Sequence, residues 1–416
     1  MAPVQSEDDV VFGETEAFFL LNTAFLVAGE ALTAPGLRPE ERLATLMECH
    51  GEALAALGPN ASLSFGQFRA KLRGPVRDLL PEWISSDGLE DLTVLDGDGY
   101  VTEDAFDLRW ESTELLNLIK KLRDFGGGRV SPDRVRHHIA QTEVFEAIAG
   151  RGPEQYILDR SNLITYPAGD TGELSGLGLP LKAVGFYTDI SYQALYHDWW
   201  FPCPVCRWPM KVTQYQAGGS EYGKAECFYP QHADTGARYS FQPTNGPPLL
   251  QPYAEAFRPT AREAPLHLTV PDQPPEARPA AGCKALTRGV WRYTTVPGLP
   301  ELRLHQELER RLAGKATVQL WPLGDAYDHR VEVTRPDGAT AEFKADLKDY
   351  THAHTLGKSI HRAKGDRGGA DWLVVPDHRA DQVPLLDGVC GKYRMRAISA
   401  TDFAEMVCDE AGVQWV

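Results

Sequence analysis

The chain has 416 residues and a mass of 46.0 kDa, which leaves room for two or three domains. Hydrophobic residues make up 43% and charged residues 24%, a balance typical of soluble globular proteins and unlike that of disordered chains. The net charge is −16, and most of it lies in the first 150 residues, which hold 26 acidic and 13 basic residues. This region is therefore a poor candidate for the main phosphate-binding surface and is better suited to a protein partner or a regulatory role.

No segment is expected to span a membrane, and the apolar run at 17–29 is interpreted as a buried helix. The acidic residues at 7–9 that precede it are unlike the basic start of a signal peptide. The chain has seven cysteines, two of them in a CxxC motif, which favours a reducing compartment over a disulfide framework. We therefore expect a cytoplasmic protein.

Residues 1–150 are predicted to form an acidic, mostly helical domain with a two-stranded ribbon at 84–110. Helices followed by a ribbon also occur in winged-helix DNA readers, but the acidic ribbon favours a structural or protein-binding role. Helices are expected near 14–32, 39–57, 64–81, 111–124 and 132–149.

The segment 96–104, DGDGYVTED, resembles part of an EF-hand loop. With Gly99 at the sixth position of that loop, Val94 and Ala105 would occupy the first and twelfth, and neither can bind calcium. The sequence therefore predicts a hairpin turn here and no calcium site.

Residues 151–242 contain Cys203 and Cys206 in a CxxC motif, followed after twenty residues by Cys227 and His232. Three thiolates and one imidazole at this spacing match a closed tetrahedral zinc site, so a structural Zn²⁺ in a zinc ribbon is expected. The alternative is that His232 lies on the surface and the cysteines pack as small apolar residues.

Aromatic and basic residues alternate around this motif, and two interpretations of them stay open. They could stack on nucleic acid and neutralise its phosphates, or the tryptophans could form the small core that a zinc ribbon needs. The residues are Trp199, Trp200, Arg207, Trp208, Lys211 and Lys224.

Residues 243–285 are rich in proline and are predicted to be a semi-extended linker with a short strand at 266–270. The remaining domain, 286–416, is predicted to be α/β with a mixed sheet, which makes the whole chain a multidomain α+β protein. Its expected order is a helix at 300–314, a strand at 316–323, a hairpin at 328–350, a helix at 353–364, strands at 372–376 and 393–399, and a helix at 401–407 that Thr401 caps.

The hairpin carries the strongest chemical signal in the sequence. Segments 330–334 and 339–347 alternate in polarity around the turn residues RPDG, so Asp328 is expected opposite Asp346. Because side chains of a strand alternate with period two, Asp346 and Lys348 project from the same face. Two carboxylates beside a lysine can hold a divalent metal and a water molecule against a phosphodiester.

A rival acid-x-lysine pair, Glu342 and Lys344, shares this face. The register separates the two pairs, because Glu342 is expected near Val331, inside the hairpin and away from Asp328. We therefore prefer Asp346 and Lys348.

This order of elements with D…DxK resembles the PD-(D/E)xK restriction-endonuclease-like superfamily over roughly residues 296–416. The resemblance implies that Asp328 and Asp346 bind a catalytic Mg²⁺ or Mn²⁺, that Lys348 is the catalytic lysine, and that Glu301 is the acid many members carry on their first helix. The sequence departs from the pattern in having no proline directly before Asp328 and in having Asp as its second acid.

Together with the zinc motif and the lead-in at 286–304, the chain is also similar to an endonuclease family of bacterial defence cassettes. These cassettes also encode a prokaryotic Piwi-like protein and a helicase, which would be its partners.

The expected function is thus metal-dependent hydrolysis of DNA, with a role in defence against foreign DNA. A duplex cutter with one active site would have to dimerise or act twice, so a homodimer is one expected state. The alternative is a non-catalytic adaptor that binds nucleic acid or protein through its zinc ribbon and helical domain. A labile divalent site beside the structural zinc would distinguish the two.

Overall fold

The computed structural model describes residues 14–34, 36–58, 61–86, 89, 92–97, 99–109, 111–112, 140–217, 220–253 and 257–416. The chain divides into two compact units. The first unit comprises residues 1–130 and 350–363, and the second comprises residues 131–349 and 364–416.

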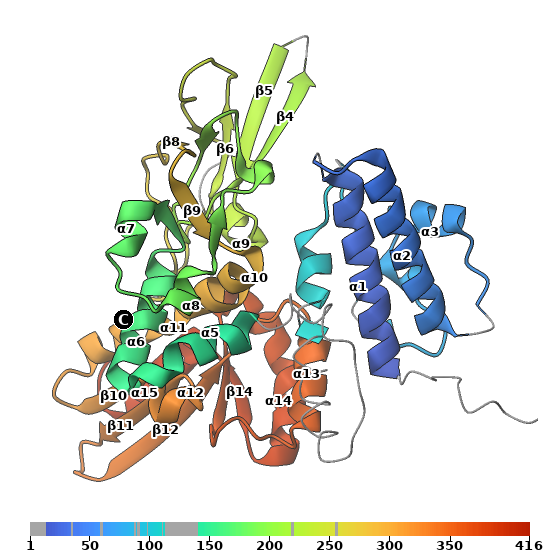
Figure 1. Cartoon of the computed structure of the whole chain (residues 1–416). Coiled ribbons are helices and arrows are strands. Elements are labelled where there is room, and N and C mark those ends of the chain that lie inside the picture. The colour runs from blue at the N-terminus through green and yellow to red at the C-terminus, as the bar shows by residue number, and fades with distance from the viewer. Residues whose placement is uncertain are drawn as a thin grey trace, which may run out of the picture. The chain divides into compact units, whose positions relative to one another are not determined.

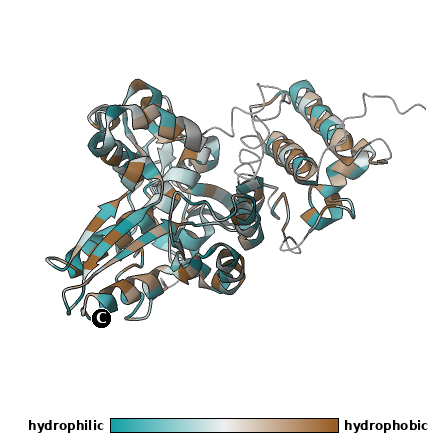
Figure 2. Cartoon of the chain, turned by 90° about the horizontal axis from the view of Figure 1, so that it is seen from below, coloured by the Kyte–Doolittle hydropathy of each residue, from teal (hydrophilic) through white to brown (hydrophobic). Residues whose placement is uncertain are grey.

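Two long helices, α1 (Glu14–Thr33) and α2 (Pro39–Leu57), form the centre of the first unit and agree with the predicted helices. Contrary to our expectation, the window Glu16–Thr33 is long and apolar enough to span a membrane by composition alone, although half of it is buried within the structure. Leu21 and Phe25 of this window pack in the core of the unit, as in the core helix of a globular domain. Hydrophobic and hydrophilic residues are interspersed along the helices of the structure (Figure 2).

The helix predicted at 64–81 is wrong in its second half. It ends as α3 (Phe65–Lys71) and is followed by a short 3₁₀ helix, Val76–Leu79, because Pro75 has no amide hydrogen with which to continue an α-helix. The first unit also contains α13 (Ala353–Arg362), close to its predicted range.

The expected ribbon at 84–110 is much shorter in the structure. Among the described residues it consists of one antiparallel bridge, Leu95 to Val101, closed by a turn with Gly99 at a φ of 87°. Residues 103–109 are helical instead. The turn itself agrees with the prediction, whereas the helix predicted at 111–124 lies almost entirely outside the described residues, and that predicted at 132–149 is described only from residue 140.

The second unit is organised around a mixed five-stranded sheet in the order β10-β11-β12-β13-β14. Strands β10, β11 and β12 are antiparallel and lie side by side in Figure 1, and β12, β13 and β14 are parallel. This confirms the expected mixed sheet. The strands span Ala316–Leu320 (β10), His329–Thr334 (β11), Thr340–Leu347 (β12), Trp372–Val375 (β13) and Arg396–Ser399 (β14).

One face of this sheet is covered by α11 (Val296–Arg311) and α15 (Ala400–Glu410). Leu308 of α11 and Phe403 of α15 pack on Val331 and Leu347, which alternate with polar residues along their strands. Asp346 belongs to the opposite phase of β12. The alternation therefore separates a packed face from the face that carries the acids.

Two helix boundaries differ from the predictions, and one helix was not predicted. Pro300 lies inside α11 and not at its start, because the helix is entered through one turn of π-helix at Trp291–Thr295. Helix α15 is capped by Ser399, which accepts from the amide of Asp402, and not by Thr401. An additional helix, α14 (Val383–Cys390), lies between β13 and β14.

The rest of the second unit forms small antiparallel sheets around a shared core. Its sheets are β4-β5-β6-β7, β1-β9-β2 and β3-β8. The strands span Ala168–Asp170 (β1), Tyr187–Asp189 (β2), Trp199–Trp200 (β3), Lys211–Ala217 (β4), Ser220–Glu226 (β5), Arg238–Phe241 (β6), Gln251–Pro252 (β7), Arg278–Pro279 (β8) and Cys283–Leu286 (β9). The helices are α5 (Ala140–Ile148), α6 (Pro153–Thr165), α7 (Thr171–Ser175), α8 (Leu181–Val184), α9 (Pro230–Asp234) and α10 (Arg288–Val290).

The segment predicted as a linker, 243–285, is built into this fold. It supplies β7, β8 and most of β9, and β9 is the central strand of its sheet. The predicted strand at 266–270 is wrong, since those residues are neither strand nor helix and Leu266 packs beside Leu304 in the core of the main sheet. Prolines restrict where a chain can donate hydrogen bonds but do not prevent short strands at sheet edges.

The packing of α11 on the sheet gives a test of this fold. Leu308 is fully buried, so Leu308→Ala should lower the free energy of unfolding of the second unit by about 2–5 kcal/mol. Leu249→Ala, at a side chain that is 85% exposed, should change it by less than about 0.5 kcal/mol. Denaturant unfolding followed by circular dichroism measures both, and equal effects would contradict the packing described.

Candidate active site and metal centre

Two buried carboxylates and a lysine meet at the end of the β11–β12 hairpin. The amide of Asp328 donates to the carbonyl of Ala345 at 3.0 Å, which continues the pairing of His329 with Ala345 and sets Asp328 opposite Asp346. The Nζ atom of Lys348 lies 2.7 Å from Oδ1 of Asp346 and 3.7 Å from Oδ2 of Asp328. The three side chains predicted from the sequence therefore lie together.

Backbone and side-chain contacts hold the two acids in different ways. Oδ2 of Asp328 accepts a hydrogen bond from the amide of Leu347 at 2.6 Å. Oδ2 of Asp346 is buried and, within the described residues, has no hydrogen-bond partner. Buried carboxylate oxygens are rarely left without a donor, so this oxygen fits the position of a ligand to a hard divalent cation.

The charges of the three groups are strongly linked. Burial raises the pKa of Asp346, with a further contribution from Asp328, and the Lys348 ammonium opposes this rise. Burial alone would lower the pKa of Lys348, but the carboxylates of Asp328 and Asp346 hold it above its ordinary value. Lys348 is therefore a cation at neutral pH and offsets part of the negative charge of the acids.

Glu301 approaches the site from α11. Its Oε2 accepts hydrogen bonds from Nη2 of Arg160 at 2.8 Å and from Nε1 of Trp321 at 2.7 Å. Burial raises the pKa of Glu301 to about 8, although the Arg160 guanidinium lowers it. The Glu301 carboxyl is thus held in a fixed orientation by two donors.

Arg160, which the sequence analysis missed, comes from α6 and stacks on Trp321 with its Cζ atom 4.2 Å from the ring centroid. It also pairs with Asp325, which accepts a second hydrogen bond from the Tyr156 hydroxyl at 2.6 Å. The close packing of α6 on α11 requires Gly298, because a Cβ atom there would lie 2.3 Å from Ile164. The available signal was the spacing of Tyr156 and Arg160, four residues apart on one helix face.

The rival pair lies on the solvated part of the hairpin. Glu342 is exposed, accepts from Nε of Arg330 at 2.6 Å, and lies 3.0 Å from Nζ of Lys344. It pairs across the hairpin with Glu332, one residue from the predicted position at Val331. These contacts are those of an exposed strand face and do not involve Asp328.

A second cluster brings together Cys203, Cys206, Cys227 and His232, all buried, with their ligand atoms within 4.8 Å of one another. The sulfurs of Cys206 and Cys227 are 3.8 Å apart, and the Cys227 sulfur is 3.5 Å from Nδ1 of His232. A tetrahedral zinc ion with ordinary bond lengths would separate these atoms by about 3.8 Å and about 3.6 Å. The four residues therefore fit a structural metal such as zinc, and the burial of His232 excludes the surface-histidine alternative.

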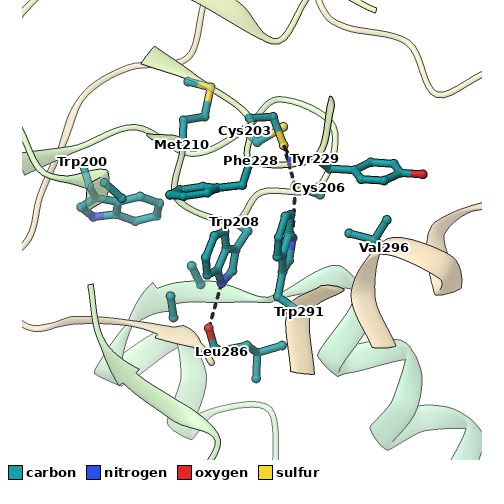
Figure 3. Close-up of a cluster of buried hydrophobic side chains, with 14 of the residues drawn as sticks. Trp200, Cys203, Cys206, Trp208, Met210, Phe228, Tyr229, Leu286, Trp291 and Val296 are labelled. Atoms are coloured by element: carbon teal, nitrogen blue, oxygen red, sulfur yellow. Dashed lines mark hydrogen bonds between the residues drawn. The ribbon is translucent and has the colours of Figure 1, made fainter. Parts of the chain in front are cut away.

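Hydrogen bonds and a tight turn fix Cys203 and Cys206, the first two residues of the cluster. The amide of Cys203 donates to the carbonyl of Trp208, the amide of Arg207 donates back to Cys203, and Arg207 adopts a φ of 60°. Nε1 of Trp291 lies 3.4 Å from the Cys206 sulfur (Figure 3). Donors of this kind orient thiolate ligands and stabilise their charge.

The tryptophans near this cluster belong to its core. Trp200 and Trp208 are buried, and Trp208 stacks on Trp291 with ring centroids 4.2 Å apart (Figure 3). Trp208 also donates to the carbonyl of Leu286. Of the two interpretations left open by the sequence, the structure favours the small core for these rings over stacking on nucleic acid.

Comparison with known families identifies one match. Residues 298–415 match a family model described as "REase associating with pPIWI_RE", where REase denotes a restriction endonuclease. No curated protein and no solved structure matches the chain. The match supports a restriction-endonuclease-like domain in a pPIWI defence context, and it covers all five strands of the main sheet together with Glu301, Asp328, Asp346 and Lys348.

The cysteine–histidine cluster makes a direct analytical prediction. The purified protein should contain about one zinc ion per chain, and Cys206→Ser should lose most of it because three ligands hold zinc much less tightly than four. Cys283→Ser is the matched control, since Cys283 is buried but outside the cluster. Elemental analysis measures the content, and full zinc retention in Cys206→Ser would contradict the assignment.

The contact between Arg160 and Glu301 predicts that the loss of Arg160 destabilises the second unit more than the loss of an exposed arginine does. Arg160→Met removes a hydrogen-bond donor from the buried carboxyl of Glu301 and should lower the free energy of unfolding by about 1–3 kcal/mol. Arg258→Met, at an exposed arginine, should change it by less than about 0.5 kcal/mol. Chemical denaturation of both variants at the same pH tests this, and indistinguishable midpoints would show that Arg160 does not support the site.

Proposed function

We propose that the second unit is a metal-dependent endonuclease that hydrolyses phosphodiester bonds in DNA. The observation that carries the proposal is the meeting of buried Asp328 and Asp346 with Lys348, in which one buried oxygen of Asp346 has no donor among the described residues. Among reactions consistent with a restriction-endonuclease-like domain, this arrangement is best suited to hydrolysis assisted by a divalent cation.

Asp328 and Asp346 would hold Mg²⁺ or Mn²⁺. When bound, the ion polarises the scissile phosphoryl oxygen and lowers the pKa of a coordinated water molecule. The amide of Leu347 fixes Asp328, so that little reorganisation of the acid pair is needed on binding.

Lys348 is the third group of the proposed site, beside Asp328 and Asp346. Its ammonium group lies beside both acids, where it orients the attacking water through a hydrogen bond and offsets the negative charge that develops on the phosphate. Glu301, held by Arg160 and Trp321, supports the arrangement from α11 as an additional acceptor near Asp328 and Lys348.

The biological role that we propose is defence against foreign DNA. The matched family is described as associating with pPIWI_RE, so we propose a Piwi-like protein as a partner of this chain and a helicase as a further one. We further propose that the protein acts in the cytoplasm, that Zn²⁺ occupies the cysteine–histidine cluster, and that cutting of both strands of a duplex uses a homodimer or two successive events.

Cleavage of single-stranded DNA, double-stranded DNA and RNA with Mg²⁺ or Mn²⁺ tests the function. Wild type should cut DNA, and Asp346→Asn and Lys348→Ala should each reduce the rate by about 100-fold or more, because the former loses a metal-binding charge and the latter the charge beside the water. If the isolated chain shows no cleavage, the assay should be repeated with the proposed Piwi-like protein and helicase.

Glu342→Gln and Lys344→Ala are the matched controls, because they change the same residue types on the exposed part of the same strand. They should retain most of the activity. Equal cleavage by wild type and by Asp346→Asn would contradict the assigned site, and loss of activity in the controls alone would favour the rival pair.

A further inference from the structure

Tyr229 lies between the cysteine–histidine cluster and the end of β12, which Lys348 directly follows. Its amide donates to the Cys227 sulfur at 3.4 Å, and its hydroxyl donates to Oδ2 of Asp349 at 2.6 Å. Asp349 directly follows Lys348 in the chain. In Figure 3 the Tyr229 ring extends away from Cys203 and Cys206 with its hydroxyl at the far end. Tyr229 thus contacts Cys227 of the cysteine–histidine cluster and also Asp349, which is next to Lys348 of the candidate active site.

Asp349 is fixed by additional partners. Nε2 of His378 and Nε of Arg379, which follow β13, each lie 3.3 Å from its Oδ1. Burial alone would raise the pKa of Asp349, but His378, Arg379 and Arg292 hold it well below its usual range. A buried ionised carboxylate depends strongly on its donors, so the loss of one should change its position.

The ring of Tyr229 is also held in place. It is 2% exposed, and the guanidinium carbon of Arg292 lies 4.8 Å from its centroid. The His232 ring packs against it edge-on at 4.9 Å. Arg292 belongs to the π-helical turn that leads into α11, the helix of Glu301. The Tyr229 ring therefore contacts both the metal-binding loop, residues 227–232, and the start of α11. Movement of the loop would therefore be transmitted by the ring.

Packing around this contact is incomplete. A cavity of about 180 Å³ beside it has Tyr229, His232, Asp349 and His378 among its lining residues. The Tyr229 hydroxyl also lies 3.0 Å from Nε2 of His378 and accepts from Nη2 of Arg379 at 3.4 Å. Because close packing is interrupted here, these polar contacts, with the bond to Asp349, connect the tyrosine to the segments that follow β12 and β13.

We propose that Tyr229 couples metal occupancy of the cysteine–histidine cluster to the position of Lys348 through Asp349. Tyr229 is a positioning residue. When the cluster is loaded, the segment 227–232, which runs into α9, fixes the tyrosine. The tyrosine fixes Asp349 and thereby the end of β12. When the cluster is empty, this end of the strand loosens and Lys348 loses its alignment with Asp346. An effect of this coupling on DNA cleavage rests on the proposed nuclease function. The coupling between the cluster and the position of Lys348 does not.

Hydrogen exchange measured by mass spectrometry tests the coupling without requiring activity. In wild type, removal of zinc with a chelator should accelerate exchange in residues 344–349. Tyr229→Phe loaded with zinc should already exchange faster there, by about threefold to tenfold, as expected for the loss of one hydrogen bond. Asp349→Asn, which leaves the metal-binding loop unchanged, should accelerate the same segment while it retains zinc.

Tyr239→Phe is the matched control, because the Tyr239 hydroxyl is buried in the same core and has no hydrogen-bond partner in the structure as described. It should behave as wild type. Wild-type exchange in zinc-loaded Tyr229→Phe and Asp349→Asn would overturn the coupling. Where wild type cleaves DNA, Tyr229→Phe should lower kcat with little change in KM. Absence of cleavage by wild type, both alone and with the proposed partners, would instead argue against the nuclease and leave the exchange result to decide the coupling.

Discussion

The acid pair across the β11–β12 hairpin is the constraint on which the rest of the second unit depends. Asp328 and Asp346 face one another only in the observed register, because side chains alternate between the two faces of a sheet. A slip of β12 by one residue would turn Asp346 toward Val331 and the core under α11 and α15, and would turn Leu347 out of that core. The apolar residues of the opposite phase therefore fix the position of the acids as firmly as their own contacts do.

The surroundings of this pair come from several parts of the chain. Glu301 lies on α11, Arg160 on α6, and the Tyr229 hydroxyl reaches Asp349 from the metal-binding loop. Arg160 and Tyr229 precede the segment 298–415 that matches the restriction-endonuclease family. The residues that match the family thus form the sheet and its acids, and upstream residues of the same compact unit complete the shell around them.

The sequence predicted those features that depend on local pattern. Alternation and turn residues located the hairpin, its register followed from the position of Pro336 and Asp337, and the CxxC motif with the later Cys227 and His232 identified the four clustered residues. The limits of α2 were also predicted, because proline at its first turn marks its start. For the same reason Pro300 was mistaken for a helix start, since nothing local shows that a π-helical turn precedes it.

The features that were missed depend on contacts between residues distant in sequence. The proline-rich segment 243–285 was expected to be a linker, yet β9 pairs with β1 and β2, which lie about a hundred residues earlier. Arg160 reaches Glu301 across 141 positions, and Tyr229 reaches Asp349 across 120. Periodicity reports which face of an element is buried but not which element covers it, so neither contact could be derived from the sequence.

The proposed nuclease requires that Asp328 and Asp346 form a divalent-cation site separate from the cysteine–histidine cluster. The most direct measurement is a titration of the zinc-loaded protein with Mn²⁺, followed by electron paramagnetic resonance, for wild type and Asp346→Asn. We expect a labile Mn²⁺ site in wild type that is lost or strongly weakened in the variant, with zinc content unchanged in both. Identical Mn²⁺ binding by the two proteins, or none by either, would contradict it and favour a non-catalytic adaptor.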